Sequence, residues 1–313
     1  MTTAFLFPGQ GSQFVGMGQD LYEHAPAARV RFDAADELLG YALTDVMFGR
    51  SADDEAAAED ALKQTEVTQP ALYTHSLAVM AVLADAGIAP DMAAGHSLGE
   101  YSALAASGAL SFEDGLRVVR RRGELMAEAG ERRPGAMAAV LGVDDATIES
   151  VCQEVSDGDE AVVQPANFNA PGQTVISGDV EAVEQAMDDL PGRTIRLPVS
   201  GAFHSPLMAY AENGLAEVLD TVDIRPPQCP VYLNVTAQPT TDPDEIRTQL
   251  LAQLRAPVRW AQTLQSMEAG GAGRFIEVGA GKVLRGLVRR TIGRDAETHG
   301  AGTAAEVKAL ADA

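Results

Sequence analysis

Short apolar runs alternate along the chain with longer segments in which apolar residues recur every three or four positions. The run AFLF at residues 4–7 predicts a buried strand, and the glycine-rich turn PGQGSQ follows it. Residues 69–86 carry apolar side chains at helical spacing, with a glycine after them as a stop signal. A strand, a turn around Ser97 and a helix are predicted over residues 93–106. Because strands that alternate with helices form parallel sheets, the pattern predicts an α/β fold with a mainly parallel sheet.

A different pattern occupies residues 133–198. Its segments are predicted as strand, helix, strand, strand, helix and strand, which is the order of a split βαβ or ferredoxin-like unit. The α/β pattern then returns, with a strand at CPVYLNV and a strand, turn and helix in RFIEVGAGKVLRGLVRR. We therefore expect a large domain, residues 1–132 and 199–313, and a small domain, residues 133–198, inserted into it. The polar, alanine-rich tail from Arg294 is expected to fray or to cap the fold.

The composition narrows the class of protein. The chain has 313 residues, 46% of them hydrophobic, and no apolar run approaches the roughly 20 residues that cross a bilayer. The start MTTAFLFPGQ lacks the basic and apolar regions of a secretory leader, so we expect a cytoplasmic protein with no membrane partner. Cys152 and Cys229 are the only cysteines and match no disulfide or metal-binding pattern. We therefore expect buried thiols and no metal.

The formal net charge of −22 argues against nucleic acid as a partner, because phosphate binding needs clustered cations. The acidic residues are spread along the chain, and the only lysines are Lys63, Lys282 and Lys308. This composition predicts a solvated acidic surface of the kind that suits a salty cytoplasm.

Ser97 lies in Gly95-His96-Ser97-Leu98-Gly99, which has the GxSxG pattern of a nucleophile elbow. Two interpretations are open, a catalytic turn and a tight structural loop. In a catalytic turn the glycines allow the sharp bend that exposes the serine hydroxyl, and the N–H of Leu98 at the helix start stabilises a developing oxyanion. The strand predicted before the motif and the helix predicted after it favour the catalytic interpretation.

A serine hydroxyl is a weak nucleophile unless a base takes its proton, so the histidines are the next candidates. Three of them lie in polar segments or within a predicted helix, where a structural role is the better interpretation: His24, His75 and His299. His96 adjoins the serine, but neighbours in an elbow point in different directions, which favours packing or a partner contact. His204, in LPVSGAFHSPLM, is the candidate base. No acid between Ser97 and His204 stands out as its partner, so either the triad is incomplete or a carbonyl orients the imidazole.

Four motifs occur together in the chain: FPGQGSQ (7–13), GHSLGEYSA (95–103), RRRGELM (120–126) and GAFHSPLM (201–208). In this order and spacing they resemble the malonyl-CoA:acyl carrier protein transacylases of fatty acid synthesis and the related acyltransferase domains of polyketide synthases. Further matches make the resemblance cover nearly the whole chain: TQPAL (68–72), NFNAPGQTVISG (167–178), APVRW (256–260) and EVGAGKVLRGL (277–287).

The resemblance implies an α/β-hydrolase-like large domain with a parallel sheet and an inserted ferredoxin-like small domain. It implies that Ser97 takes the malonyl group from malonyl-CoA and passes it to the phosphopantetheine thiol of acyl carrier protein, with His204 as general base. The oxyanion donors would be the N–H groups of Leu98 and Gln10, although the glycines alone favour a structural turn at PGQGSQ. By the same resemblance the backbone carbonyl of Gln253 orients the histidine, so that no acid is needed.

Two further residues bear on the choice of acyl group. Arg122 matches the residue that binds the free malonyl carboxylate in the family, whereas an arginine run by itself is typical of a solvated helix face. Phe203 resembles the residue of the malonyl-selective members, because a bulky ring near the α-carbon disfavours a methyl branch. Without the resemblance it would be interpreted as a core aromatic.

The resemblance also implies the partners, namely acyl carrier protein and malonyl-CoA, with no resident cofactor and a monomer as the default state. Carrier proteins are acidic, so a local run of cations is a candidate docking or CoA phosphate site, against a plain helix face: Lys282, Arg285, Arg289, Arg290 and Arg294. The span of the motifs leads us to expect a free-standing transacylase that supplies fatty acid biosynthesis. The alternatives are a serine thioesterase or hydrolase with the same Ser97–His204 pair, and a non-catalytic docking subunit.

Overall fold

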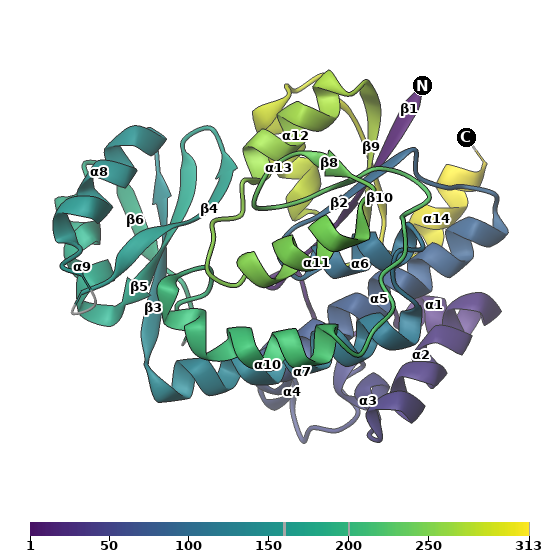
Figure 1. Cartoon of the computed structure of the whole chain (residues 1–313). Helices are drawn as coiled ribbons and strands as arrows, with labels where there is room; N and C mark the ends of the chain where they lie inside the picture. Colours follow the sequence, from purple (N-terminus) through teal and green to yellow (C-terminus); the bar gives the residue numbers. More distant parts are fainter. Residues whose placement is uncertain (159–160, 200, 313) are drawn as a thin grey trace.

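The computed structural model describes residues 1–158, 161–199 and 201–312 and contains two separate sheets (Figure 1). The larger sheet has the strand order β10-β9-β1-β2-β7-β8, and its neighbouring strands are parallel except for β7 and β8. Its strands are β1 (Thr2–Phe7), β2 (Met92–Gly95), β7 (Val231–Tyr232), β8 (Pro239–Thr240), β9 (Ala272–Val278) and β10 (Glu297–Ala301). The predicted α/β fold with a mainly parallel sheet is confirmed.

Strand β1 lies in the middle of the larger sheet and is apolar on both faces. Phe5 and Phe7 pack into one core cluster, whereas Ala4 and Leu6 pack into a second cluster with Trp260. These four side chains are fully buried, whereas Thr2 and Thr3 at the start of β1 are partly exposed. A parallel strand covered by helices on both faces needs apolar residues at every position, which explains the continuous run AFLF.

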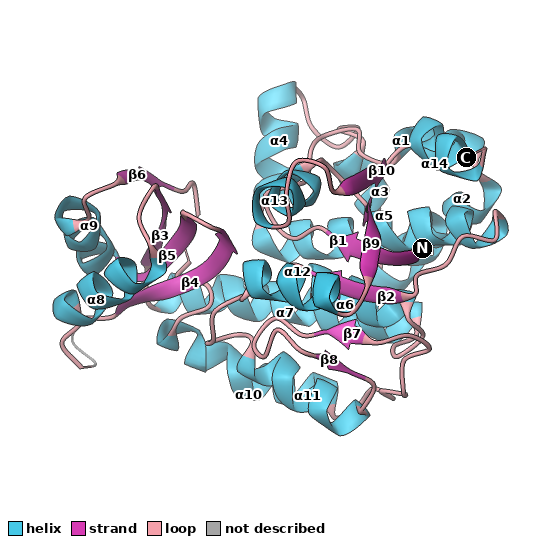
Figure 2. Cartoon of the chain, turned by 90° about the horizontal axis from the view of Figure 1, so that it is seen from above, coloured by secondary structure: helices cyan, strands magenta, loops and turns pink. Residues whose placement is uncertain are grey.

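Helices cover both faces of the larger sheet (Figure 2). One face is packed by α12 (Trp260–Ala269) and α13 (Val283–Thr291), whose apolar residues belong to the second cluster. The other helices of this part of the chain are α1 (Gln19–His24), α2 (Pro26–Leu39), α3 (Leu43–Met47), α4 (Glu55–Lys63), α5 (Thr65–Asp85), α6 (Gly99–Ala106), α7 (Phe112–Arg132), the 3-10 helix η1 (Pro206–Met208), α10 (Ala209–Leu219), α11 (Pro243–Ala252) and α14 (Ala304–Ala311).

The smaller sheet is antiparallel and has the strand order β4-β5-β3-β6. Its elements are β3 (Gly135–Leu141), α8 (Asp145–Val155), β4 (Val163–Ala170), β5 (Gln173–Asp179), α9 (Val180–Asp189) and β6 (Arg193–Arg196). Sheet and helices share a core cluster of their own, which includes Ala138, Ile148 and Val183. The N-cap of helix α8 is Asp144, whose side chain accepts the N–H of Thr147 at 2.9 Å.

Strand β4 joins the smaller sheet to the rest of the molecule. Asn167 forms a parallel bridge with Val258, and the N–H of Phe168 donates to the Val258 carbonyl at 2.9 Å. The N–H of Val258 donates in turn to the Ala166 carbonyl at 2.8 Å. This pairing holds the end of β4 beside the segment that leads into α12, near the carboxyl end of β2.

One expectation from the sequence is narrowed and another is corrected. Of the two alternatives for the tail after Arg294, its described residues agree with capping and not with fraying, because β10 pairs in parallel with β9 and the buried side chains of Val307 and Leu310 attach α14 to the core. The strand predicted over CPVYLNV is shorter than expected, since only Val231 and Tyr232 form β7. Residues 159, 160, 200 and 313 of the predicted domains lie outside the described residues.

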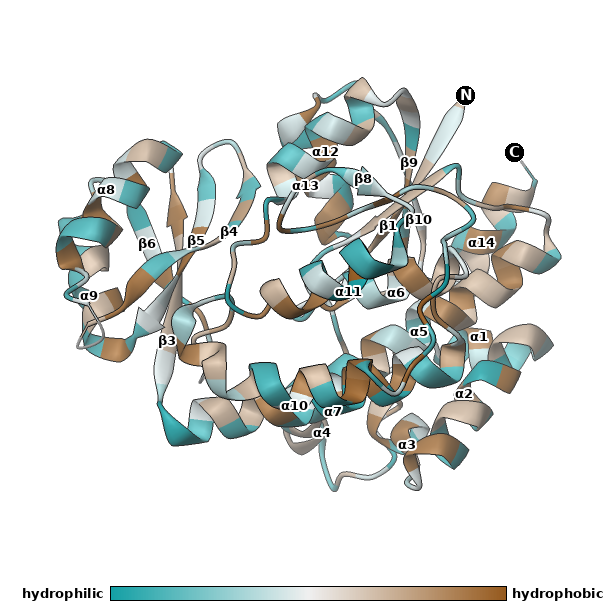
Figure 3. Cartoon of the chain, in the orientation of Figure 1, coloured by the Kyte–Doolittle hydropathy of each residue, from teal (hydrophilic) through white to brown (hydrophobic). Residues whose placement is uncertain are grey.

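Figure 3 shows that the helices around the larger sheet carry both polar and apolar residues. This distribution is typical of helices that cover a core on one side and meet solvent on the other. Among the described residues, no helix combines the length and the apolar character that a membrane span requires.

Candidate active site

Ser97 occupies a sharp turn between the carboxyl end of β2 and the start of α6. Its φ is 51°, in the left-handed region that residues other than glycine rarely adopt. The two glycines of the motif are required by close approaches. A Cβ on Gly95 would lie 1.9 Å from the backbone carbon of Gly99, and a Cβ on Gly99 would lie 2.1 Å from the carbonyl oxygen of Phe7. The geometry is that of a nucleophile elbow.

The structure brings Ser97 and His204 together. Ser97 Oγ lies 2.8 Å from His204 Nε2, and His204 Nδ1 lies 2.8 Å from the backbone carbonyl oxygen of Gln253. A carbonyl oxygen can only accept, so the hydrogen-bond pattern assigns the proton to Nδ1 and leaves Nε2 to accept from the serine hydroxyl. This is the tautomer that a general base needs.

His204 is only 3% exposed. Burial, followed by the nearby positive charge of Arg122, lowers the pKa of His204 to about 3. The imidazole is therefore neutral at physiological pH, which keeps its Nε2 lone pair available for the serine proton.

Arg122 lies beside this pair, on the buried face of α7. It is 1% exposed, and its Nη2 lies 3.2 Å from Ser97 Oγ. Its neighbours Arg120 and Arg121 are half-exposed and pair with Glu124. The solvated-face interpretation therefore holds for Arg120 and Arg121 and fails for Arg122, because a helix turns by about 100° between successive residues and can bury one of three.

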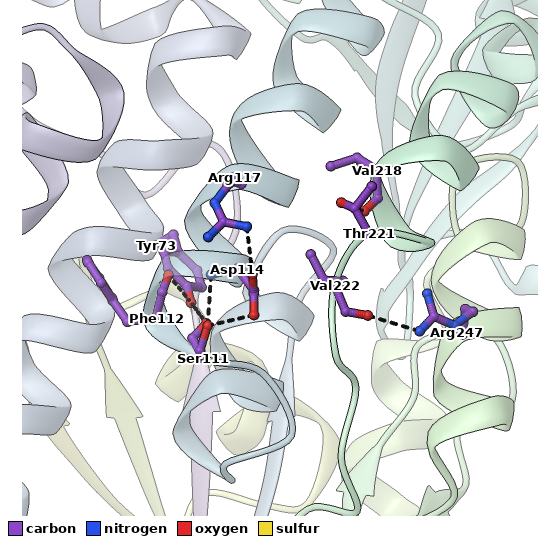
Figure 4. A network of polar contacts seen from close by, with 9 residues as sticks. All are labelled: Tyr73, Ser111, Phe112, Asp114, Arg117, Val218, Thr221, Val222 and Arg247. Carbon is purple, nitrogen blue, oxygen red and sulfur yellow. Dashed lines mark hydrogen bonds and ion pairs between the residues drawn. The ribbon is translucent and has the colours of Figure 1, made fainter.

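The start of α7 is fixed by its own polar contacts (Figure 4). Ser111 is the N-cap and accepts the N–H of Asp114 at 2.9 Å, and Asp114 accepts from Arg117 at 2.8 Å. From α5, the Tyr73 hydroxyl donates to the Phe112 carbonyl at 3.2 Å. These contacts set the rotation of α7 that carries Arg122 to the serine.

The two backbone N–H groups predicted as oxyanion donors belong to turns that meet at the carboxyl end of the sheet. The N–H of His96 donates to the Phe7 carbonyl at 3.0 Å, and a Cβ on Gly9 would lie 2.3 Å from the His96 carbonyl oxygen. Among the described residues, the N–H groups of Gln10 and Leu98 have no hydrogen-bond acceptor. Both donors therefore remain free to bind a substrate oxygen.

Sequence reasoning missed Asn234, which clamps the elbow from the end of β7. Its Oδ1 accepts the N–H of Ser97 at 2.7 Å, and its Nδ2 donates to the Gly95 carbonyl at 2.7 Å. Its backbone N–H donates at 2.7 Å to Glu100, a carboxyl buried at the start of α6. The available signal was the position of Asn234 directly after a strand that neighbours β2, where polar residues of an α/β sheet gather.

Sequence reasoning also missed the side chains that hold Arg122. Gln69 Oε1 accepts from Nη1 at 2.8 Å, and Gln253 Oε1 accepts from Nη2 at 3.0 Å. The guanidinium lies 5.5 Å from the centre of the Tyr101 ring. The motif TQPAL, which contains Gln69, gives no signal of this contact, since an amide within a helical pattern does not by itself indicate a partner.

His96 and Phe203 lie in the surroundings of the pair. His96 Nε2 donates to Asn169 Oδ1 of β4 at 2.8 Å, and the His96 ring packs edge-on against Trp260 with centroids 5.4 Å apart. The packing interpretation of His96 therefore agrees with its contacts. Phe203 is buried in the larger core cluster, and its part in acyl selectivity stays a prediction.

The run of cations predicted as a docking or phosphate site lies on and after α13. Arg285 pairs with Glu277 and Glu306, so its charge is largely neutralised. The others are exposed and have no acid partner among the described residues: Lys282, Arg289, Arg290 and Arg294. Within the described part of the chain, no group of His, Cys, Asp or Glu has the arrangement of a metal site.

A hydrogen-bonded serine and buried histidine at the carboxyl edge of a parallel sheet form the arrangement of enzymes that act through a serine nucleophile. The family model described as acyl transferase domain matches residues 4–308. The chain belongs to this acyl transferase family.

Individual relatives agree with this assignment. The chain is 48% identical over 291 residues to the malonyl CoA-acyl carrier protein transacylase of Bacillus subtilis (strain 168), covering 92% of this chain and 89% of that protein. The crystal structure of MCAT from Streptococcus pneumoniae matches with a TM-score of 0.91 and 41% identity over 99% of both chains. A malonyl-transacylase solved in complex with its type II PKS acyl-carrier protein matches with a TM-score of 0.92 and 38% identity, over 100% of this chain and 99% of that chain.

Proposed function

We propose that this protein transfers the malonyl group of malonyl-CoA to the phosphopantetheine thiol of acyl carrier protein through a malonyl-Ser97 intermediate, as a step of fatty acid biosynthesis. The observation that carries the proposal is a buried guanidinium, that of Arg122, 3.2 Å from a serine hydroxyl that is itself 2.8 Å from a neutral histidine. This combines an acyl-accepting nucleophile with a site for a second, anionic end of the acyl group. The names of the relatives describe the same chemistry.

In the first half-reaction, His204 Nε2 takes the proton of Ser97 as Oγ attacks the thioester carbonyl. The N–H groups of Gln10 and Leu98 stabilise the oxyanion of the tetrahedral intermediate, each contributing about 3 to 4 kcal/mol to the transition state. The intermediate collapses to malonyl-serine, and the departing CoA sulfur takes the proton from His204. The thiol of the carrier then gives its proton to His204, attacks the malonyl-serine carbonyl and releases Ser97, which regains its proton.

Arg122 binds the malonyl carboxylate in this scheme. Its side chain has five N–H donors, and its Nε has no partner among the described residues. A charge-assisted hydrogen bond of about 1.5 to 3 kcal/mol corresponds to a preference of roughly ten- to hundredfold for malonyl over a neutral acyl group.

We also propose the finer fold assignment. The order of the smaller sheet, β4-β5-β3-β6, with two helices on one face supports a ferredoxin-like subdomain inserted in a larger, α/β-hydrolase-like domain. The elbow between β2 and α6 supports the hydrolase-like assignment, since that fold presents its nucleophile at the same kind of turn.

For the carrier protein, the proposed docking surface is formed by the exposed cations on α13 and directly beside its two ends: Lys282, Arg289, Arg290 and Arg294. These four cations have no acid partner among the residues that the structure describes, on a chain of net charge −22 that would otherwise repel an acidic carrier. The transacylase that was solved with its acyl-carrier protein supports such a partner.

The monomeric state, the absence of a resident cofactor and the cytoplasmic location stay predictions.

A serine hydrolase is the second candidate, because it would use the same Ser97–His204 pair with water as the acceptor. The transfer assay separates the two. Malonyl-CoA is mixed with the protein and with carrier protein that either bears or lacks phosphopantetheine, and malonyl-carrier and free malonate are both quantified. We expect malonyl-carrier only with the phosphopantetheine form, and no product of either kind with Ser97→Ala. Malonate as the main product would support the hydrolase instead.

A further inference from the structure

Arg122 is a buried cation without a carboxylate partner. Among the described residues, no Asp or Glu oxygen lies within the 4.0 Å of an ion pair, although Arg120 and Arg121 on the same helix both have one. Isolated buried charges are costly, and proteins normally pair them. Since the Arg122 side chain is only 1% exposed, other groups around it must stabilise the unpaired guanidinium.

Two neutral amides occupy the places that acids would normally take. Gln69 Oε1 and Gln253 Oε1 accept from the two terminal nitrogens of Arg122 at 2.8 and 3.0 Å. Both glutamine side chains are fully buried. An amide oxygen satisfies a guanidinium N–H as a carboxylate would, but it leaves the positive charge uncompensated.

The orientation of each amide is fixed by its other end. Gln69 Nε2 donates to the sulfur of Met126 at 3.3 Å, and Gln253 Nε2 donates to the Ser97 carbonyl at 3.1 Å. With the NH₂ groups engaged in this way, both oxygens face Arg122. The guanidinium is thus held in place next to the nucleophile before any substrate arrives.

Among the described residues, the buried acid near this cluster is Glu100, on α6. Burial raises the pKa of the Glu100 carboxyl to about 8. At neutral pH the protonated form of Glu100 therefore predominates although Arg122 favours the ionised form, and Glu100 adds little negative charge beside Arg122.

We propose that Gln69, together with the side chain of Gln253, is a specificity-determining positioning residue that holds Arg122 without neutralising it, so that the carboxylate of the incoming acyl group supplies the missing negative charge. This inference rests on the proposed function and names what makes the site selective. A carboxylate at either glutamine position would occupy Arg122 permanently, and the substrate would have to compete with it in a medium where such pairs are strong.

The test replaces Gln69 by the isosteric acid in Gln69→Glu and measures kcat and KM for loading of Ser97 from malonyl-CoA and from acetyl-CoA. We expect kcat/KM for malonyl-CoA to fall at least tenfold, mainly through KM, and kcat/KM for acetyl-CoA to stay within about threefold. Gln238→Glu adds the same charge at an exposed position and should leave both values unchanged. Equal losses for the two substrates, or an unchanged malonyl-to-acetyl ratio, would overturn the inference.

Gln69→Met provides a second measurement in case the buried acid prevents folding. Methionine is about as long as glutamine but lacks the amide oxygen that accepts from Arg122 Nη1. Arg122 therefore keeps its charge and loses one of its two hydrogen bonds to glutamine. We expect a raised KM for malonyl-CoA with little change for acetyl-CoA, and an unchanged ratio would count against the inference. Measurements on the wild-type protein distinguish the two hypotheses. Failure of the wild type to load malonyl at all would refute the proposed function. Normal loading by the wild type, with unaltered selectivity in both variants, would refute only the role of Gln69.

Discussion

At the scale of single residues, the proposed reaction depends on the charge states of His204 and Arg122. His204 can act as a base only when its imidazole is neutral, and the proposed role of Arg122 in binding a carboxylate requires that its charge is not already paired. Ser97 and His204 could be predicted from the sequence because each lies in a motif with a strand or helix boundary beside it. Gln69 and Asn234 could not, since an amide reveals its role only through the tertiary contacts that reach it.

The lowered pKa of His204 predicts a flat pH profile near neutrality. An unshifted histidine would lose half of its base form at pH 6.5, whereas a value of about 3 keeps the imidazole neutral far below that. The kcat/KM for malonyl-CoA, which reports on the free enzyme, should therefore change less than twofold between pH 5.5 and 7.5. An acidic limb with a midpoint close to 6.5 would show that the histidine is not shielded as described.

Arg122→Ala should reduce transfer of malonyl far more than transfer of acetyl. The loss of one charge-assisted contact predicts a fall of roughly ten- to hundredfold in kcat/KM for malonyl-CoA. Arg121→Ala, which removes the adjacent arginine from the exposed side of α7, is the matched control and should have little effect. The role assigned to Arg122 fails if both acyl groups lose activity by the same factor.

At the scale of elements, the site is formed by the segments that follow three neighbouring strands of the larger sheet. The elbow after β2, the turn after β1 and Asn234 after β7 come together because parallel strands present their carboxyl ends at one edge. Strands and helices of clear periodicity were predictable, as at residues 4–7 and 69–86. The two-residue length of β7 and the edge strand β10 were not, because pairing with neighbours, rather than local apolar pattern, decides both.

Asn234→Ala tests the clamp on the elbow. Removing the amide leaves the Ser97 N–H and the Gly95 carbonyl unpaired in a buried position, at a cost of about 1 to 3 kcal/mol each. We expect a lower thermal midpoint and at least a tenfold lower kcat, with KM for malonyl-CoA little changed, since the strained φ of Ser97 relaxes. Asn213→Ala, on the exposed side of α10, is the control. Wild-type kcat in a folded Asn234→Ala variant would contradict this role.

At the scale of the whole molecule, the large negative net charge is expected to affect stability. A net charge of −22 produces self-repulsion that salt screens, because the Debye length falls from about 10 Å at 0.1 M to about 3 Å at 1 M. We therefore predict that raising potassium chloride from about 0.1 to 1 M raises the thermal midpoint by at least a few degrees. Sodium chloride should act alike if screening is the cause. A midpoint that falls or stays constant would show that repulsion does not limit stability.

The most direct test of the central claim follows the fate of the acyl-enzyme. The protein is mixed with malonyl-CoA, the malonyl group is located by peptide mass spectrometry, and the isolated acyl-enzyme is then divided between buffer and phosphopantetheine-bearing carrier protein. The account predicts a malonyl adduct on Ser97 that persists in buffer and discharges to the carrier thiol. An adduct that hydrolyses in buffer as fast as it discharges to carrier, or a modified residue other than Ser97, would contradict it.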